Sequence, residues 1–147
     1  MTSLLSVKPI DPKDRLIVAL DVPDADAARA VVIELGDEVV FYKIGLELFM
    51  TSGYFELLEW LVGQGKKVFV DLKFFDVPET VRSAVRALAG SGAAFATIHG
   101  NQAIMEAAVK EDVYKRQDQG RLRDADRCRL CTGDGVFRVS ARGEADR

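Results

Sequence analysis

Along the first 111 residues, strand-like and helix-like segments alternate four times, and this order restricts the possible folds more than any other feature. The expected strands are apolar runs at residues 16–21, 39–44, 67–72 and 94–99. The expected helices span residues 24–35, 46–62, 78–89 and 102–110, and the second is broken near residues 52–53. Strands and helices that alternate with short connections are typical of a parallel α/β sheet with right-handed crossovers.

Polar residues at the strand ends distinguish the two folds that this order allows, a TIM barrel and an open doubly wound sheet. The four strands end, in turn, in Asp21, Lys43, the pair Asp71 and Lys73, and His99. In a barrel these carboxyl ends surround one mouth, whereas in an open sheet they spread along an edge. The pattern therefore favours a TIM (β/α)8 barrel. A whole barrel takes about 250 residues, so four units are the first half of one.

Capping residues indicate where the expected helices begin and end. Asp24 or Asp26 is suited to cap the first helix, and Gly36 suits the position after its last turn. Pro78 is typical of a first helical turn, and Gly90 stops that helix before the fourth strand. In the second helical region we expect the large apolar side chains to pack in the core, namely Phe49, Met50, Phe55 and Trp60.

The last 36 residues differ from the rest of the chain. They hold nine basic and seven acidic residues, and both cysteines, Cys128 and Cys131. The cysteine spacing fits a zinc or redox motif, but two further zinc ligands and a strand–helix context are missing, so no such function is assigned. We expect residues 1–111 to form the half-barrel domain and residues 112–147 a poorly structured tail. Our hypothesis is that the reading frame or cloned segment departs from the parent protein near residues 111–114.

Composition favours a protein of the cytoplasm that binds neither nucleic acid nor membrane. The net charge of −3 gives no basic surface for nucleic acid. The apolar runs are far shorter than a membrane span. The first ten residues lack the basic start and the cleavage pattern of a signal peptide.

Three charged residues lie within six positions after the third strand, and Lys43 ends the second. Asp71 and Lys73 are two residues apart, so on a strand they point to the same face, while Asp76 falls in the loop before a helix. Side chains of alternating charge can keep one another ionised in a site too dry for any of them alone. An amine there can deliver a proton to a carbanion, and a carboxylate can crowd an anionic substrate group. A structural ion pair is the alternative interpretation.

These residues resemble the signature of the orotidine 5′-phosphate decarboxylase family. The matching motifs are Asp71-x-Lys73-x-x-Asp76 with Val77-Pro78-x-Thr80, Ala19-Leu20-Asp21-Val22, Tyr42-Lys43-Ile44-Gly45 and Thr97-Ile98-His99-Gly100. The resemblance covers residues 15–111 and implies a TIM barrel that converts orotidine 5′-phosphate to uridine 5′-phosphate, without a cofactor, in pyrimidine synthesis. Residues after about 111 do not resemble the family.

The resemblance also implies a role for each matched position. Lys73 would protonate C6 of the pyrimidine as carbon dioxide leaves, with Asp71 against the departing carboxylate. Lys43 would bridge the charge network and the ribose, and Asp21 would bind a ribose hydroxyl. His99 is interpreted as a hydrogen-bonded structural residue.

The family resemblance further implies a homodimer with shared active sites. Asp76 and Thr80 would reach into the partner's site, and Val77 would line its pocket. Without the second half of the barrel, we expect this chain to show little or no activity by itself and to self-associate through exposed apolar surface. A barrel fragment with no catalytic function is therefore an alternative.

A metal-dependent activity is the nearest enzymatic alternative. The 3-keto-L-gulonate 6-phosphate decarboxylases and hexulose-phosphate synthases share the Asp-x-Lys-x-x-Asp frame, and they bind magnesium partly through an acid at the end of the second strand. This chain has Lys43 there, and a cation at that place would repel a divalent metal. We therefore expect a site without a metal ion.

Overall fold

The computed structural model describes the backbone of residues 11–118 and 136–138 and the side chains of residues 11–110. It starts with a short 3-10 helix, Pro12–Arg15. The strands are β1 (Val18–Ala19), β2 (Phe41–Gly45), β3 (Lys67–Phe74), β4 (Phe95–Ile98) and β5 (Val136–Arg138). The helices are α1 (Ala25–Leu35), α2 (Leu46–Phe49), α3 (Tyr54–Gly63), α4 (Pro78–Ala89) and α5 (Gln102–Asp118).

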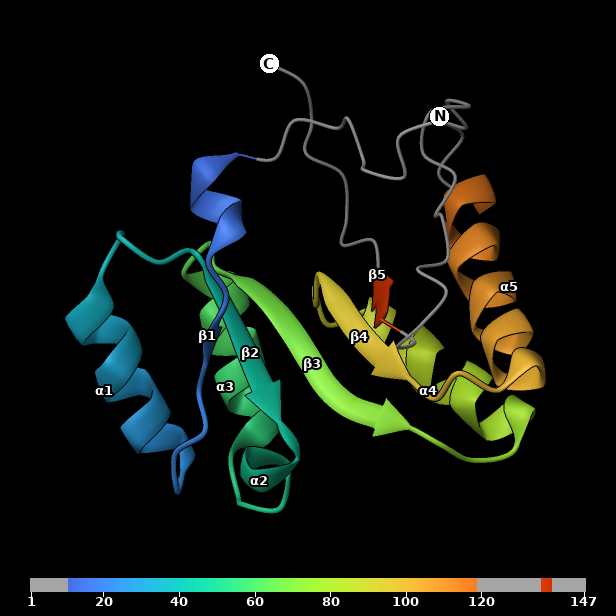
Figure 1. The fold of residues 1–147 in the computed structure, drawn as a ribbon, viewed down its shortest axis with the longest axis horizontal. Helices are drawn as coiled ribbons and strands as arrows, with labels where there is room; N and C mark the ends of the chain where they lie inside the picture. Colours follow the sequence, from blue (N-terminus) through green and yellow to red (C-terminus); the bar gives the residue numbers. More distant parts are fainter. Residues whose placement is uncertain (1–10, 119–135, 139–147) are drawn as a thin grey trace, which may run out of the picture.

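The described strands form one sheet in the order β1-β2-β3-β4-β5. The first four strands pair in parallel, as the alternating pattern predicts. Figure 1 shows α3 and α4 behind the sheet, with α1 and α5 at its two sides. This is the arrangement of the first four βα units of a TIM barrel, and it brings the carboxyl ends of β1–β4 to the same end of the molecule.

Alternate residues of the strands pack against the helices and form the main core. Tyr42 and Ile44 of β2 and Val68 and Val70 of β3 are fully buried there, together with Leu57 of α3. Burying an aliphatic side chain of this size contributes roughly 1.5–3 kcal/mol. Because strand side chains alternate between faces, the residues between these positions face the inside of the half-barrel.

Residues at the helix ends behave largely as the capping patterns predict. Of the two candidate caps of α1, Asp24 is the one used, accepting a 2.8 Å hydrogen bond from a backbone N–H of the first turn, while Asp26 lies inside that turn. Gly36 follows the helix with φ +54°, which explains the glycine there. Pro78 begins α4 and Gly90 follows its end.

The first strand is shorter and more exposed than the sequence predicts. Only Val18–Ala19 is strand, and the preceding Leu16 and Ile17 have exposed fractions of 55% and 44%. A strand buried on both faces is therefore the wrong expectation here. β1 is an edge strand of the described sheet. Within the described residues it pairs with β2 alone.

The core prediction for the second helical region is wrong for three of its four residues. Phe49, Met50 and Phe55 are exposed, whereas Trp60 is partly buried against the core. The region is two helices joined by a turn at residues 50–53, so its apolar residues do not follow a single stripe. Phe49 instead packs edge-on against Tyr54 with ring centroids 5.3 Å apart.

Beyond residue 110, the described backbone holds the last turns of α5 and the short strand β5. Helix α5 continues to Asp118, further than the expected end at residue 110. Strand β5 pairs antiparallel with β4, at the edge where a TIM barrel would add a parallel strand. Cys128 and Cys131 lie outside the described residues. Among the helices described, none combines the length and apolarity needed to cross a membrane.

Candidate active site

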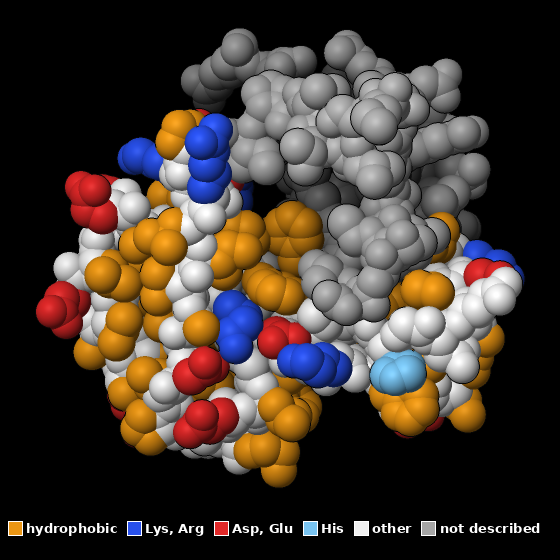
Figure 2. All heavy atoms as spheres, viewed as in Figure 1, with side chains coloured by type: hydrophobic (Ala, Val, Ile, Leu, Met, Phe, Trp, Pro, Cys, Tyr) orange, Lys and Arg blue, Asp and Glu red, His pale blue; other side chains and the backbone are white. Residues whose placement is uncertain are grey.

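Charged side chains from three strand ends meet at one point of the half-barrel mouth. Lys43 Nζ lies 3.2 Å from Asp21 Oδ1 and 3.8 Å from Asp71 Oδ2. Lys73 Nζ donates a 2.8 Å hydrogen bond to Asp71 Oδ1. Figure 2 shows acidic and basic side chains side by side at the lower ends of the strands, bordered above by apolar side chains. We call these four residues, Asp21, Lys43, Asp71 and Lys73, the charged group.

Strand alternation explains why polar residues gather here. The three central strands each carry a phenylalanine two positions before a polar residue, in the pairs Phe41 and Lys43, Phe69 and Asp71, and Phe95 and Thr97. Residues two apart on a strand share a face. The rings pack together, with centroids 5.5 Å apart for Phe41 and Phe95 and 6.3 Å apart for Phe69 and Phe95. An aromatic layer therefore lies beneath the polar ends.

The backbone of β3 is irregular at the point where Lys73 contacts Asp71. Its φ is +48°, and the pairing of β3 with β4 shifts register between Val70 and Phe74. The two side chains meet as the spacing predicts, although the strand is irregular at Lys73. The Lys73 N–H donates a 2.8 Å hydrogen bond to Thr97 Oγ1 of β4.

Thr97 belongs to the site but was not among the residues that sequence reasoning assigned to it. Its side chain is buried at 5% exposure, and its hydroxyl donates a 2.8 Å hydrogen bond to Asp71 Oδ1. One feature of the sequence could have indicated Thr97 as a site residue. It lies at the end of β4, two residues after Phe95, on the face that carries Asp71 and Lys43.

The surroundings of Asp71 favour its charged form. Burial by itself raises the pKa of Asp71, but hydrogen bonds from Lys73 and Thr97, together with the charges of Lys73 and Lys43, outweigh burial and hold that pKa below its usual range. Burial, and then the negative charge of Asp71, raise the pKa of the neighbouring Tyr54. The site thus keeps an ionised carboxylate and a neutral phenol close together.

Asp76, Val77 and Thr80 are not bonded to the charged group in the described part of the chain. In the part of the chain with described side chains, Asp76 has no ion pair with the group, and its Oδ1 accepts a 2.6 Å hydrogen bond from the Val77 N–H. Val77 is 62% exposed. The Thr80 N–H donates a 3.0 Å hydrogen bond to the Val77 carbonyl, inside the first turn of α4. Within the described side chains, none of these three residues thus has a hydrogen bond or ion pair to the charged group of its own chain.

His99 also lies outside the charged group. Its backbone N–H donates a 2.9 Å hydrogen bond to the Phe74 carbonyl, and its ring lies 4.4 Å from the Phe75 ring, centroid to centroid. Of the four polar strand ends, those of β1, β2 and β3 therefore come together directly, while β4 contributes Thr97 in place of His99.

The donor set does not suit a divalent metal ion. The Lys43 ammonium lies between the carboxylates of Asp21 and Asp71, so a cation of the chain already stands where two acids converge. Within the described residues, no three acid, histidine or cysteine side chains gather as metal ligands would. The expected repulsion between Lys43 and a metal thus has a geometric basis.

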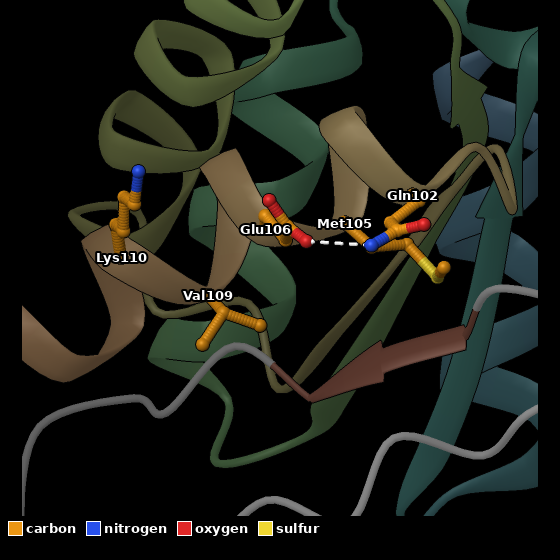
Figure 3. A pocket seen from close by; sticks show the side chains of 5 residues that line it. All are labelled: Gln102, Met105, Glu106, Val109 and Lys110. Carbon is orange, nitrogen blue, oxygen red and sulfur yellow. Dashed lines mark hydrogen bonds between the residues drawn. The ribbon is translucent and has the colours of Figure 1, made fainter.

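A separate hollow of about 500 Å³ lies along α5, and the described side chains that line it all belong to that helix (Figure 3). Its lining residues are Gln102, Met105, Glu106, Val109 and Lys110. Gln102 Nε2 donates a 3.0 Å hydrogen bond to Glu106 Oε1, so these two polar side chains already satisfy each other. None of the charged group lines this hollow, and the charged group is the better candidate for chemistry.

Comparison with known proteins identifies the family. A family model described as "Orotidine 5'-phosphate decarboxylase / HUMPS family" matches residues 14–126. The orotidine 5′-phosphate decarboxylase of Methylococcus capsulatus is 56% identical over 133 residues, covering 84% of this chain and 55% of that protein. The enzyme of Methylobacterium radiotolerans is 49% identical over 100 residues, covering 68% of this chain and 43% of that protein. The chain spans about half the length of these curated relatives.

Solved structures agree on the fold. Orotidine 5′-phosphate decarboxylase of Lactobacillus acidophilus matches with a TM-score of 0.61 and 35% identity, over 67% of this chain and 45% of that one. Orotidine 5′-monophosphate decarboxylase of Methanocaldococcus jannaschii, complexed with the inhibitor BMP, matches with a TM-score of 0.61 and 26% identity, over 69% and 48%. The half-barrel predicted from the sequence is thereby confirmed, and the chain belongs to the orotidine 5′-phosphate decarboxylase / HUMPS family.

Proposed function

We propose that this chain carries the first half of the active site of an orotidine 5′-phosphate decarboxylase, an enzyme of pyrimidine biosynthesis that forms uridine 5′-phosphate and carbon dioxide. The observation that carries the proposal is the geometry of the charged group. Lys73 Nζ lies 2.8 Å from Asp71 Oδ1, and Lys43 Nζ is within 4 Å of the carboxylates of both Asp71 and Asp21. The family match and the curated relatives support the same activity.

The chemistry follows from these positions without a cofactor. The bond between C6 of the pyrimidine and its carboxylate breaks, carbon dioxide leaves, and the electron pair stays on C6. The Lys73 ammonium then delivers its proton to C6 and regains one from solvent. Asp71, which is held ionised, lies against the departing carboxylate and makes its loss more favourable.

Two residues of the charged group bind rather than react. Asp21 is 59% exposed in its side chain, which leaves its carboxylate free to accept a hydrogen bond from a ribose hydroxyl. Lys43 is 23% exposed and joins Asp21 to Asp71, so it connects ribose binding to the reacting end of the site.

A homodimer in the cytoplasm is the proposed setting. Asp76, Val77 and Thr80 would complete the site of the partner subunit. What supports this is the exposure of the loop that carries them, where Phe75 and Val77 are 69% and 62% exposed. Large apolar side chains on a loop beside a site are typical of a surface that another chain covers.

The boundary of the barrel part of this chain, near residue 111, also remains a proposal. The change in charge density and the two cysteines beyond it support such a boundary. The family match to residue 126 and the continuation of α5 to Asp118 allow a later position. Sequencing the parent transcript across residues 105–130 tests it, and a continuous reading frame through this tail would remove the frame-change hypothesis.

Ligand-dependent thermal stability tests binding by the chain itself. Uridine 5′-phosphate, or an analogue substituted at C6, should raise the melting temperature in a concentration-dependent way, because a ligand that binds the folded state stabilises it. Asp21→Asn should weaken that effect. Asp26→Asn, which changes an exposed aspartate on α1, is the matched control. A melting temperature unchanged by either ligand would favour the alternative of a barrel fragment without function.

Turnover tests the complete site. A fusion of residues 1–118 to the second half of the Methylococcus capsulatus relative should decarboxylate orotidine 5′-phosphate, whereas the 147-residue chain should show little or no activity. Lys73→Ala in the fusion should remove turnover, and Lys67→Ala, at the opposite end of β3, should keep it. Activity that disappears with a chelator would instead favour the metal-dependent members of the family.

A further inference from the structure

We infer that Thr97 is a positioning residue of this site, whose hydroxyl holds the Lys73 backbone and the Asp71 carboxylate in their working arrangement. The inference rests on the proposed function for its consequence in catalysis, but its structural content can be tested without substrate. Thr97 touches neither the Asp21 carboxylate nor the Lys43 ammonium in any described hydrogen bond, so it acts through Asp71 and Lys73.

The hydroxyl of Thr97 has both of its hydrogen-bonding functions in use. It accepts from the Lys73 N–H at 2.8 Å and donates its one proton to Asp71 Oδ1 at 2.8 Å. The side chain is only 5% exposed, and Thr97 is the one polar residue among those described as buried. A buried hydroxyl with both bonds made has little freedom to turn, so it fixes the groups on either side.

The bond to Lys73 stabilises an unusual backbone conformation. Among the described residues, Lys73 is the one non-glycine with positive φ, at +48°. Side chains other than glycine adopt this region at a cost, and they persist there when surrounding contacts require it. The register of β3 against β4 shifts between Val70 and Phe74, which takes the Lys73 N–H out of the regular ladder. Thr97 supplies the acceptor that this N–H would otherwise lack.

The two oxygens of the Asp71 carboxylate have different partners. Oδ1 accepts from both Lys73 Nζ and Thr97 Oγ1, each at 2.8 Å. Oδ2 faces Lys43 Nζ at 3.8 Å and carries neither of these bonds. With Oδ1 held from two sides, rotation of the carboxylate is restricted, and Oδ2 is kept facing Lys43.

Substitution of Thr97 with residues of similar size separates this role from simple core packing. Thr97→Val keeps the shape and removes both hydrogen bonds, whereas Thr97→Ser keeps the hydroxyl. Thr51→Val is the matched control, because Thr51 also donates its hydroxyl proton, at 2.7 Å to the Leu48 carbonyl, but lies outside the charged group. All three variants are made in the 147-residue chain.

Two NMR measurements read the arrangement directly. The first is amide hydrogen exchange at Lys73, which should become about tenfold faster or more in Thr97→Val, because its N–H loses its acceptor. The second is the titration of the Asp71 carboxyl carbon. The Thr97 bond favours the charged carboxylate, so its loss should move the Asp71 pKa upward toward the ordinary aspartate value. The facing groups Lys43, Lys73, Asp21 and Tyr54 are unchanged.

The expected pattern is a change of both signals in Thr97→Val and of neither in Thr97→Ser or Thr51→Val. If Thr97→Val does not fold, Thr97→Cys, with a weaker donor of similar size, should show the same two changes in smaller measure. An Asp71 titration and a Lys73 exchange rate that stay as in the wild type would overturn the inference. Failure of uridine 5′-phosphate to bind would overturn the proposed function alone, since neither NMR measurement uses a ligand.

Discussion

Asp71 is the residue on which the other side chains of the site depend. It accepts hydrogen bonds from Lys73 and Thr97 and faces the Lys43 ammonium, while its own side chain is only 15% exposed. A carboxylate this far from water is stable as a charge only because these groups surround it. Removing its charge should therefore affect the stability of the fold as well as the chemistry.

Asp71→Asn should weaken the pH dependence of folding stability on the acid side. The pKa of Asp71 is lower in the folded chain than in the unfolded one, so its ionisation contributes stability that is fully present above the unfolded pKa of about 4. That contribution is lost as pH falls through the lower folded pKa. Urea unfolding of the wild type should thus lose free energy over this interval, and Asp71→Asn should lose less.

Asp26→Asn serves as the control for that comparison, because Asp26 pairs with Arg29 on the exposed surface of α1. Its acid-side profile should match that of the wild type. Equal acid-side slopes for Asp71→Asn and the wild type would show that the Asp71 carboxylate is not stabilised by its neighbours as described.

For single residues, the sequence predicted which side chains form the site better than it predicted the contacts between them. Asp21, Lys43, Asp71 and Lys73 could be proposed as one group because each follows an apolar run, and the structure brings them together. Thr97 could not be assigned, since a threonine near a strand end has many possible partners. Its bonds depend on the register of β3 against β4 and on the positive φ of Lys73, and no local pattern indicates either one.

Among the elements, strand β3 depends on contacts at both of its ends. At the amino end, the neighbouring turn after α3 is tied to the turn after α1 by Lys66. At the carboxyl end, the strand departs from regular pairing to place Lys73. Two connections between helices and strands can be tested by substitution, the turn before β3 through Lys66 and the turn before β4 through Gly92.

Lys66→Met should destabilise the fold by about 2–3 kcal/mol. The Lys66 side chain is 9% exposed, and its ammonium donates hydrogen bonds to the carbonyls of Gly36 at 2.6 Å and Val39 at 3.2 Å. Methionine keeps most of the volume but leaves both carbonyls without this donor. Chemical denaturation measures the loss in free energy of unfolding.

The adjacent Lys67→Met is the matched control. Lys67 pairs with Asp14 at 2.6 Å, but its side chain is 49% exposed, so the pair is screened by water. Its loss should cost less than about 1 kcal/mol. Similar losses for the two variants would argue against a special role for Lys66 in joining the two turns.

Gly92→Ala, in the turn between α4 and β4, should destabilise the fold by about 2 kcal/mol. Gly92 has φ +85°, and an added Cβ would lie 2.8 Å from Cγ1 of Val62 on α3. Thermal and urea unfolding should both show the loss. Gly63→Ala is the control, because a Cβ at that last residue of α3 meets nothing within 4 Å and alanine favours the helix. A neutral Gly92→Ala would mean that this turn is not packed as described.

For the whole molecule, the decisive feature is an open barrel. The described sheet has β1 at one edge, and β5 pairs antiparallel with β4 at the other side. Leu16, Ile17, Phe75 and Val77 are exposed near the edge strand and the mouth, as expected of surfaces that other parts of a barrel or a second subunit would cover.

The chain should therefore self-associate as its concentration rises. Sedimentation velocity should show species larger than a monomer, and Val77→Ser should shift the equilibrium toward the monomer because it removes exposed apolar surface from the proposed contact loop. Ile33→Ser is the matched control, since Ile33 is 71% exposed on α1. A monomer at all concentrations, or equal effects of the two variants, would contradict association through the loop.

The sequence by itself determined the alternation of the first four strands and helices, the half-barrel and the set of charged residues at the strand ends. It could do so because each depends on local periodicity or on which residue type ends a strand. Only the tertiary structure decided which neighbours each side chain meets. The exposure of Phe49, Met50 and Phe55, the shortness of β1 and the bridge through Thr97 all depend on how distant segments pack. A local sequence pattern does not specify that packing, because the residues that bury a side chain or complete its hydrogen bonds lie far away in the chain.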